Sequence, residues 1–248
     1  MSDKKKAFWF IALLSTLVII PFLGETIFYS KGEPREAIVA YSMLESGNWI
    51  LPLNYGTDIA YKPPFLYWSI AAISAIFGGV SEFSSRLPSA IAFLAMQFVF
   101  FGFVARYKDT KTAVITSLLL LTSFEVHRAA VACRLDMLQV SFIVISLCLL
   151  FRWDEKRTAR GIPWTAVVLM ACGTLTKGPV GSIFPVCVSV FTRLIRGRSF
   201  GKTFLSLFGI GLLSLIPLGI WFYAAWLQGG QPFMDLMLEE NTGRFVGK

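Results

Sequence analysis

The sequence has 248 residues, of which 55% are hydrophobic and 15% are charged, and its mean hydropathy is +0.65. Soluble globular domains carry about 25% charged residues, so this composition excludes an ordinary soluble protein. The formal net charge of +8 comes without a nucleic-acid-binding motif, and the basic residues gather in short breaks between apolar runs, which excludes nucleic acid as a partner.

Eight apolar runs follow one another along the chain, several of them reaching the roughly 18 residues that a membrane span needs. They cover residues 7–28, 64–79, 87–105, 112–126, 135–151, 163–176, 179–195 and 203–227. Four breaks in this pattern are basic and together hold 14 of the 23 lysines and arginines: 4–6, 106–111, 152–160 and 193–202. Because basic residues favour the cytoplasmic side of a membrane, we predict that these breaks and the N-terminus are cytoplasmic.

With the N-terminus inside, residues 29–62 are outside and the break 106–111 is inside, so an odd number of spans must lie between them. Two apolar runs lie there, and 64–79 is the shorter. We therefore predict that this run stays on the outer side, as a short juxtamembrane or re-entrant helix rather than a span. The expected fold is therefore an all-α polytopic membrane protein with about seven transmembrane helices and external juxtamembrane amphipathic helices. We expect a single domain over residues 1–248, with residues 29–86 as its first external loop.

The first external loop opens with signals for a short helix. Pro34 suits the first helical position, Glu33 precedes it at the positive end of the helix dipole, and Gly47 suits the C-terminal stop. Several apolar residues share one face at helical spacing: Ala37, Ile38, Ala40, Tyr41 and Leu44. We expect this amphipathic helix to lie on the outer membrane surface.

Charged residues stand at the outer mouths of different spans. Most such charges are solvated, but those that point into a helix bundle are usually functional. Asp136 and Lys177 are each embedded in apolar sequence and are the strongest candidates. The remaining candidates on the same side are Glu33, Arg35, Asp58, Lys62, Arg86, Arg134 and Arg244.

Acids beside lysine and arginine at this face suit transfer of a group from a lipid-linked phosphate donor. Basic side chains hold the phosphate, and a carboxylate takes the proton of the acceptor hydroxyl. Glu33 and Asp136 are the predicted catalytic acids, and the other candidates are predicted to bind substrate. The sequence contains no Walker loop, no GxGxxG and no DxD motif, which favours a lipid-linked donor over a nucleotide sugar.

Each of these residues has a structural alternative. Glu33 can serve as a helix N-terminal acid, Asp136 as a cap at the end of its span, and Lys62 as a lysine that snorkels to the interface. Arg86 either binds phosphate or anchors the next span. Lys177 either contacts the carrier phosphate or caps a short span.

A series of motifs runs through nearly the whole chain in order: "GEPREAIVAYSMLESGNWILP", "YKPPFLYW", "SEFSSRLPSA", "CRLD", "LTKGP" and "ENTGRF". This series resembles the C-type membrane glycosyltransferases of the aminoarabinose transferase and protein O-mannosyltransferase type. The resemblance implies transfer of a sugar from a polyprenyl or dolichyl phosphate carrier to lipid A, a protein or another acceptor. It implies a bacterial inner-membrane protein with a periplasmic active face, with Lys62 facing the phosphate and Asp136 as a second acid.

The sequence departs from the family pattern at two positions. Gly32 stands where the first acid of an Asp-Glu pair is usual, and Tyr61 stands where some members carry an acid before Lys62. We therefore predict no metal ligand and name no certain cofactor, while a divalent metal stays open. Family members are about twice as long, so we expect the chain to be a fragment, a truncated form or the product of a split gene. The expected partners are membrane lipids, the lipid-linked donor and an acceptor. An alternative is a non-catalytic transporter, or a binding or assembly protein, on the same scaffold.

Overall fold

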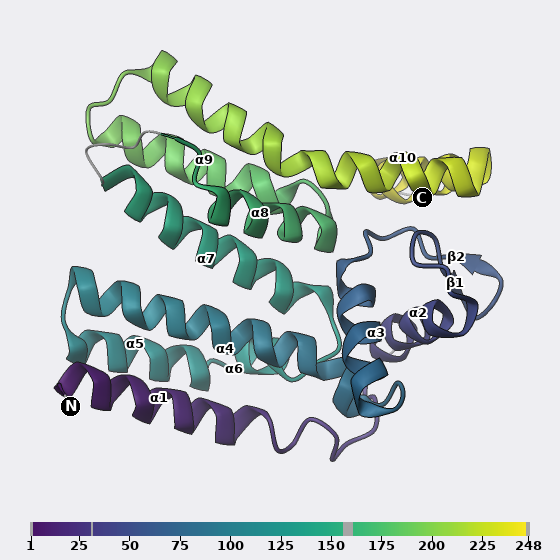
Figure 1. Ribbon diagram of the computed structural model, residues 1–248, viewed down its shortest axis with the longest axis horizontal. Helices are drawn as coiled ribbons and strands as arrows, with labels where there is room; N and C mark the ends of the chain where they lie inside the picture. Colours follow the sequence, from purple (N-terminus) through teal and green to yellow (C-terminus); the bar gives the residue numbers. More distant parts are fainter. Residues whose placement is uncertain (1, 31, 156–160, 247–248) are drawn as a thin grey trace.

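The computed structural model describes residues 2–30, 32–155 and 161–246, with side chains as far as residue 240. The described chain is almost entirely helical, which confirms the predicted all-α membrane fold (Figure 1). The helices are α1 (Asp3–Ile19), α2 (Gly32–Ser46), α3 (Phe65–Phe77), α4 (Glu82–Tyr107), α5 (Thr110–Thr122), α6 (Phe124–Ala130), α7 (Leu135–Glu155), α8 (Trp164–Lys177), α9 (Val180–Ile195) and α10 (Phe200–Val246).

The long helices lie side by side, and α2 and α3 gather at one end of them together with a small hairpin (Figure 1). The hairpin pairs β1 (Leu53–Asn54) with β2 (Asp58–Ile59) in antiparallel register, and the sequence analysis did not predict it. Tyr55 and Gly56 in its loop have positive φ angles of 54° and 75°, the backbone conformation that tight hairpin turns favour.

By length and composition, three helices can cross a membrane: α4, α7 and α10 as far as Glu240. Helices α5 and α6 make a fourth if they count as one span, bent by 70°. Helices α1, α8 and α9 have 17, 14 and 16 residues, below the usual length of a span. The predicted count of seven spans is therefore not confirmed. Helix α3, with 13 residues, is too short to cross, as predicted for the run 64–79.

The predicted helix of the first external loop is present as α2, which starts at Gly32 and stops before Gly47, where φ is +67°. Of its predicted apolar face, Ala37 and Ala40 are buried within the protein and Tyr41 is exposed. The face that packs inside the protein is made of Glu33, Glu36, Ala37, Val39, Ala40 and Met43. Two acids can occupy this face because cations from other segments neutralise them, as described below.

Helix α10 changes direction at Gly230, where the backbone is non-helical (φ 58°, ψ −148°). After this kink the chain packs back on the earlier part of the helix, and the ring of Phe233 lies edge-on to Trp221. Phe233 also belongs to the same buried cluster as Leu51, just before the hairpin. The segment after Gln228, predicted as an outer tail, thus covers the end of the molecule where α2 and α3 lie.

Helices α8 and α9 form a tight antiparallel pair. A Cβ atom at Gly181 would lie 2.4 Å from the backbone carbon of Gly173, so the close contact of the two helices requires glycine. Gly178 in the turn has a φ of +90°, which glycine adopts without strain. This turn holds Lys177 at the end of α8.

Candidate functional site

Arg86 of α4 and Glu33 of α2 form an ion pair in the interior, with 3.0 Å between Nε and Oε1. Arg86 is 1% exposed and Glu33 is 0% exposed. The same guanidinium donates to three backbone carbonyl oxygens, those of Leu23 (2.8 Å), Thr26 (2.7 Å) and Ile27 (3.0 Å). One side chain therefore joins the segment after α1 to α2 and α4.

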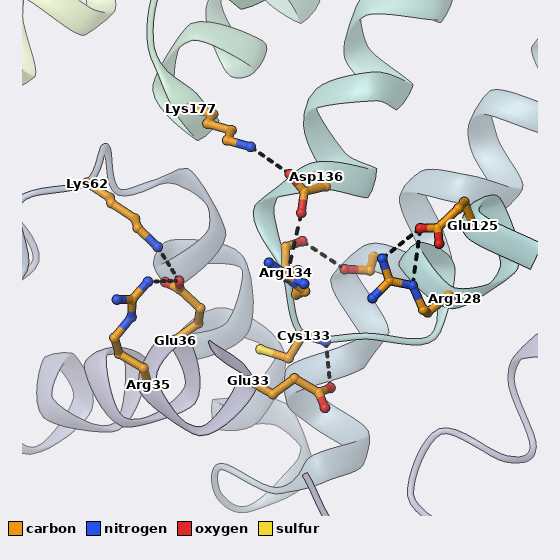
Figure 2. A network of polar contacts seen from close by, with 11 residues as sticks. Glu33, Arg35, Glu36, Lys62, Glu125, Arg128, Cys133, Arg134, Asp136 and Lys177 are labelled. Atoms are coloured by element: carbon orange, nitrogen blue, oxygen red, sulfur yellow. Dashed lines mark hydrogen bonds and ion pairs between the residues drawn. The ribbon is translucent and has the colours of Figure 1, made fainter. Parts of the chain in front are cut away.

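The Glu33 carboxylate also accepts hydrogen bonds from backbone N–H groups. Cys133 donates to Oε1 at 3.0 Å (Figure 2). Tyr29 donates to Oε2 at 3.3 Å. Cys133 and Arg134 belong to the short segment that leads into α7, and Asp136 lies in the first turn of that helix. Glu33 thus fixes the position of that segment.

This geometry argues against the predicted catalytic role of Glu33 and the predicted phosphate contact of Arg86. Both groups are closed off, and their polar atoms are already engaged within the protein. The structural alternatives describe them better: Glu33 is a buried acid near the helix start, and Arg86 anchors the start of α4.

A second acid of α2, Glu36, holds two of the predicted substrate-binding residues. Its Oε1 forms an ion pair with Lys62 and another with Arg35 at 3.3 Å, while Oε2 is buried without a hydrogen bond. Burial and the Glu36 carboxylate together raise the pKa of Tyr67 well above its usual value, so this phenol stays protonated. Lys62 is thus held by a nearly buried carboxylate instead of extending freely to the interface.

A third cluster joins the start of α7 to the end of α8. Lys177 Nζ donates to Asp136 Oδ1 at 2.6 Å, and Arg134 Nε lies 3.6 Å from Asp136 Oδ2 (Figure 2). The side chains of Asp136 and Lys177 are 44% and 52% exposed. Unlike Glu33, this acid can be reached from outside the protein. Lys62 is close enough to Asp136 to interact with it electrostatically, so the second and third clusters adjoin.

A cavity of about 480 Å³ lies beside Lys62. Its polar lining includes Arg35, Asn54, Asp58, Tyr61, Lys62 and Tyr67. Asp58 is exposed at the start of β2. The segment after the kink of α10 closes the cavity with Pro232 and Leu236, and Tyr61 donates to Glu240 at 2.8 Å. The cavity can therefore receive a polar group next to cations.

The structure brings most of the predicted site residues to one end of the bundle. Arg35, Asp58 and Lys62 meet at the cavity, and Arg134, Asp136 and Lys177 meet beside it. Glu33 and Arg86 lie in the interior between them. Arg244 lies outside the residues whose side chains are described.

Sequence reasoning missed Glu36 and Tyr67. Glu36 follows Glu33 by three positions, and Ala37 and Ala40 continue the same face, so the helical spacing already grouped both acids with small apolar residues. That signal could have indicated buried acids. Among the described residues, no group of three or more His, Cys, Asp or Glu side chains could hold a metal ion.

Residues 61–221 match the family described as dolichyl-phosphate-mannose-protein mannosyltransferase. The chain belongs to this family. The resemblance that the sequence motifs predicted is confirmed.

Curated relatives of this mannosyltransferase-family chain include proteins named undecaprenyl phosphate-alpha-4-amino-4-deoxy-L-arabinose arabinosyl transferase. The one from Shewanella sediminis is 33% identical over 179 residues, which cover 70% of this chain and 32% of the relative. The one from Edwardsiella ictaluri is 28% identical over 251 residues, covering 94% of this chain and 45% of the relative. The chain thus spans less than half the length of these two relatives.

Solved structures show the same fold. ArnT from Cupriavidus metallidurans superposes with a TM-score of 0.78 at 24% identity, covering 92% of this chain and 43% of that one. The same ArnT was also solved bound to undecaprenyl phosphate. An oligosaccharyltransferase from Archaeoglobus fulgidus gives a TM-score of 0.61 at 15% identity, covering 98% of this chain and 35% of that one.

Proposed function

We propose that this protein transfers a sugar from a polyprenyl-phosphate carrier to a lipid A, protein or other hydroxyl acceptor at the outer face of a bacterial inner membrane. The observation that carries the proposal is the Asp136–Lys177 ion pair, exposed beside the Lys62–Glu36 pair. Family membership supports the same class of donor. The names of the relatives, which include undecaprenyl phosphate, support it too.

The carrier phosphate would lie at the cations of the two adjoining clusters. Lys62, Arg35 and Lys177 would hold it, and charge-assisted hydrogen bonds of this kind are roughly twice as strong as neutral ones. The apolar tail would run along the helices in the bilayer. Lys177 would then exchange part of its contact with Asp136 for the phosphate.

In the reaction, the acceptor oxygen forms a bond to the anomeric carbon, and the bond from that carbon to the phosphate oxygen breaks. Asp136 takes the proton of the acceptor hydroxyl, and the carrier phosphate leaves with the electron pair of the broken bond. The neighbouring cations stabilise the negative charge that develops on the leaving phosphate. Asp58 and the cavity beside Lys62 would contact the sugar.

Glu33, Arg86 and Glu36 would act as positioning residues. Glu33 and Arg86 fix the segment that carries Asp136, and Glu36 fixes Lys62 and Arg35. Helix α2 thus supports the site through Glu33 and Glu36, and Glu33 does not contact the substrate. The position of the usual first family acid, Gly32, lies one helical turn before Glu36.

The test is a transfer assay with the protein reconstituted in proteoliposomes. Undecaprenyl-phosphate-linked aminoarabinose and polyprenyl-phosphate mannose are offered as radiolabelled donors, with lipid A and a membrane-protein extract as acceptors. The expected result is transfer by the unaltered protein, loss of transfer in Asp136→Asn, and retention in Glu125→Gln. Glu125 is a matched control, because it is an exposed acid paired with Arg128 in α6.

Carrier binding is measured in parallel with undecaprenyl phosphate alone. Binding without transfer of either sugar to any acceptor would contradict the proposed enzyme and favour the non-catalytic binding protein. Equal rates of transfer by the unaltered protein and by Asp136→Asn would show that Asp136 does not act as the base in the reaction.

A further inference from the structure

A separate group of cations lies at the other end of the bundle from the candidate site. Lys4 lies in the first turn of α1, Arg106 in the last turn of α4 and Arg152 near the end of α7. All three side chains line one cavity of about 400 Å³. Nothing in the proposed transfer reaction uses them.

These cations are not balanced by acids in direct contact. Within the described ranges, Lys4, Arg106 and Arg152 form no ion pair. The nearby Glu155 carboxylate accepts a hydrogen bond from the Tyr107 hydroxyl. Three like charges around one cavity repel one another, so a bound anion would remove an unfavourable interaction from the folded state.

The cavity between the cations adjoins an apolar one. Phe103 and Cys148 line both this cavity and a neighbouring cavity of about 310 Å³. The second cavity lies among α4, α7, α9 and α10, and most of its lining side chains are Phe, Leu or Val. A ligand could therefore place a charged group among the cations and an apolar chain in the adjoining space.

The far side of the apolar cavity adds to the positive potential. Asp154 lies in ion pairs with three arginines: Arg193 at 2.8 Å, Arg196 at 3.4 Å and Arg198 at 3.6 Å. This cluster has three positive charges for one negative charge. The whole end of the bundle thus favours an anion over a neutral or cationic ligand.

We propose that this end binds an anionic phospholipid, with the phosphate between Lys4, Arg106 and Arg152 and an acyl chain in the adjoining apolar cavity. Basic pockets between membrane helices are suited to anionic head groups. A free phosphate would leave the apolar cavity without a ligand, and a neutral lipid would leave the cations unpaired. Because the three cations come from α1, α4 and α7, one head group joins three helices and stabilises their packing.

The experiment uses the purified protein, delipidated in a neutral detergent and then given defined ligands. Dioleoyl phosphatidylglycerol, dihexanoyl phosphatidylglycerol, dioleoyl phosphatidylcholine and inorganic phosphate are compared by native mass spectrometry and by thermal unfolding. We expect tightest binding and the largest rise in Tm with dioleoyl phosphatidylglycerol. The double variant Arg106→Gln/Arg152→Gln is expected to weaken that binding at least tenfold.

Two control variants separate this site from general charge effects and from the donor site. Lys111→Gln removes an exposed cation of α5 that lines neither cavity, and Lys62→Met alters the candidate donor site. Both should retain phosphatidylglycerol binding at this end. Because Arg106 and Arg152 are exposed and repel each other and Lys4, the double variant without lipid should unfold at a temperature no lower than that of the unaltered protein.

Three results would overturn the proposal. The first is equal binding of phosphatidylglycerol by the double variant and by Lys111→Gln. The second is equal affinity for phosphatidylcholine and phosphatidylglycerol. The third is equal affinity for inorganic phosphate and the long-chain lipid, which would show that the apolar cavity contributes nothing.

Discussion

Arg86 donates to Glu33 at 3.0 Å in a place where neither residue is exposed, although 53 positions separate them in the sequence. The pair connects α4 to α2, and Glu33 in turn accepts a hydrogen bond from Cys133 before α7. Three separate parts of the chain therefore meet at one carboxylate. The position of the exposed acid Asp136 depends on this buried contact.

Loss of either partner of the buried pair should destabilise the protein strongly. Arg86→Met leaves a buried carboxylate without its cation, and removing one partner of such a pair typically costs about 3–5 kcal/mol. The free energy of unfolding can be measured in detergent by denaturant titration. The double variant Glu33→Gln/Arg86→Met should lose less than the sum of the two single variants. Additive losses would show that the two side chains do not interact.

Asp136→Asn should separate chemistry from binding. A positioned general base contributes about 10²–10⁴ in rate, so we expect kcat for sugar transfer to fall by that factor. The affinity for undecaprenyl phosphate should change little, because the amide keeps the shape of the side chain and Lys177 is still present. A loss of carrier affinity equal to the loss of rate would instead assign Asp136 to donor binding.

Lys62→Met should weaken binding of undecaprenyl phosphate at least tenfold, because a hydrogen bond to a charged group contributes about 1.5–3 kcal/mol. This variant also leaves the nearly buried Glu36 carboxylate without its Lys62 partner and with Arg35 as its remaining ion pair, so stability should fall as well. Carrier affinity is measured by titration and stability by thermal unfolding.

The double variant Lys62→Met/Glu36→Gln distinguishes the two effects. It removes the uncompensated charge, so we expect it to regain stability while carrier affinity stays low. If affinity returned together with stability, Lys62 would have acted through folding and not through contact with the phosphate.

The sequence predicted individual residues of the site better than their partners. Asp136 and Lys177 could be selected because each interrupts an apolar run. Their contact across 41 positions depends on the turn between α8 and α9, which no local pattern specifies. The burial of Glu33 and Glu36 could not be predicted for a similar reason. An acid is excluded from a packed face unless distant cations neutralise it, and here Arg86 and Lys62 do so.

The predicted spans show a different limit. Hydropathy located nearly every helix, but the α5–α6 bend of 70° and the kink at Gly230 lie inside or next to continuous apolar runs. Such bends are decided by packing and by backbone conformation at single residues. The count of spans therefore remains a prediction, as does the side of the membrane on which each end lies.

The contact between α8 and α9 should not tolerate a methyl group at Gly181. The added Cβ would lie 2.4 Å from the Gly173 backbone, which must move to accept it. We expect Gly181→Ala to lower stability by about 1–3 kcal/mol and to weaken transfer by shifting Lys177 from Asp136. Thermal unfolding and the transfer assay report these effects. Gly209→Ala is the control, since a Cβ there meets no atom within 4 Å, and its stability should not fall.

The carbonyl groups that Arg86 binds have a consequence for how the protein is assembled during synthesis. Leu23, Thr26 and Ile27 follow the first helix, and their carbonyl groups would be costly to bury without a hydrogen-bond donor. Their hydrogen-bond donor is made 59 to 63 residues later in the chain. Until α4 has been synthesised and inserted, these carbonyls and Glu33 must stay in contact with water or with the insertion machinery. The segment after α1 can therefore reach its final packing only after α4 has been made.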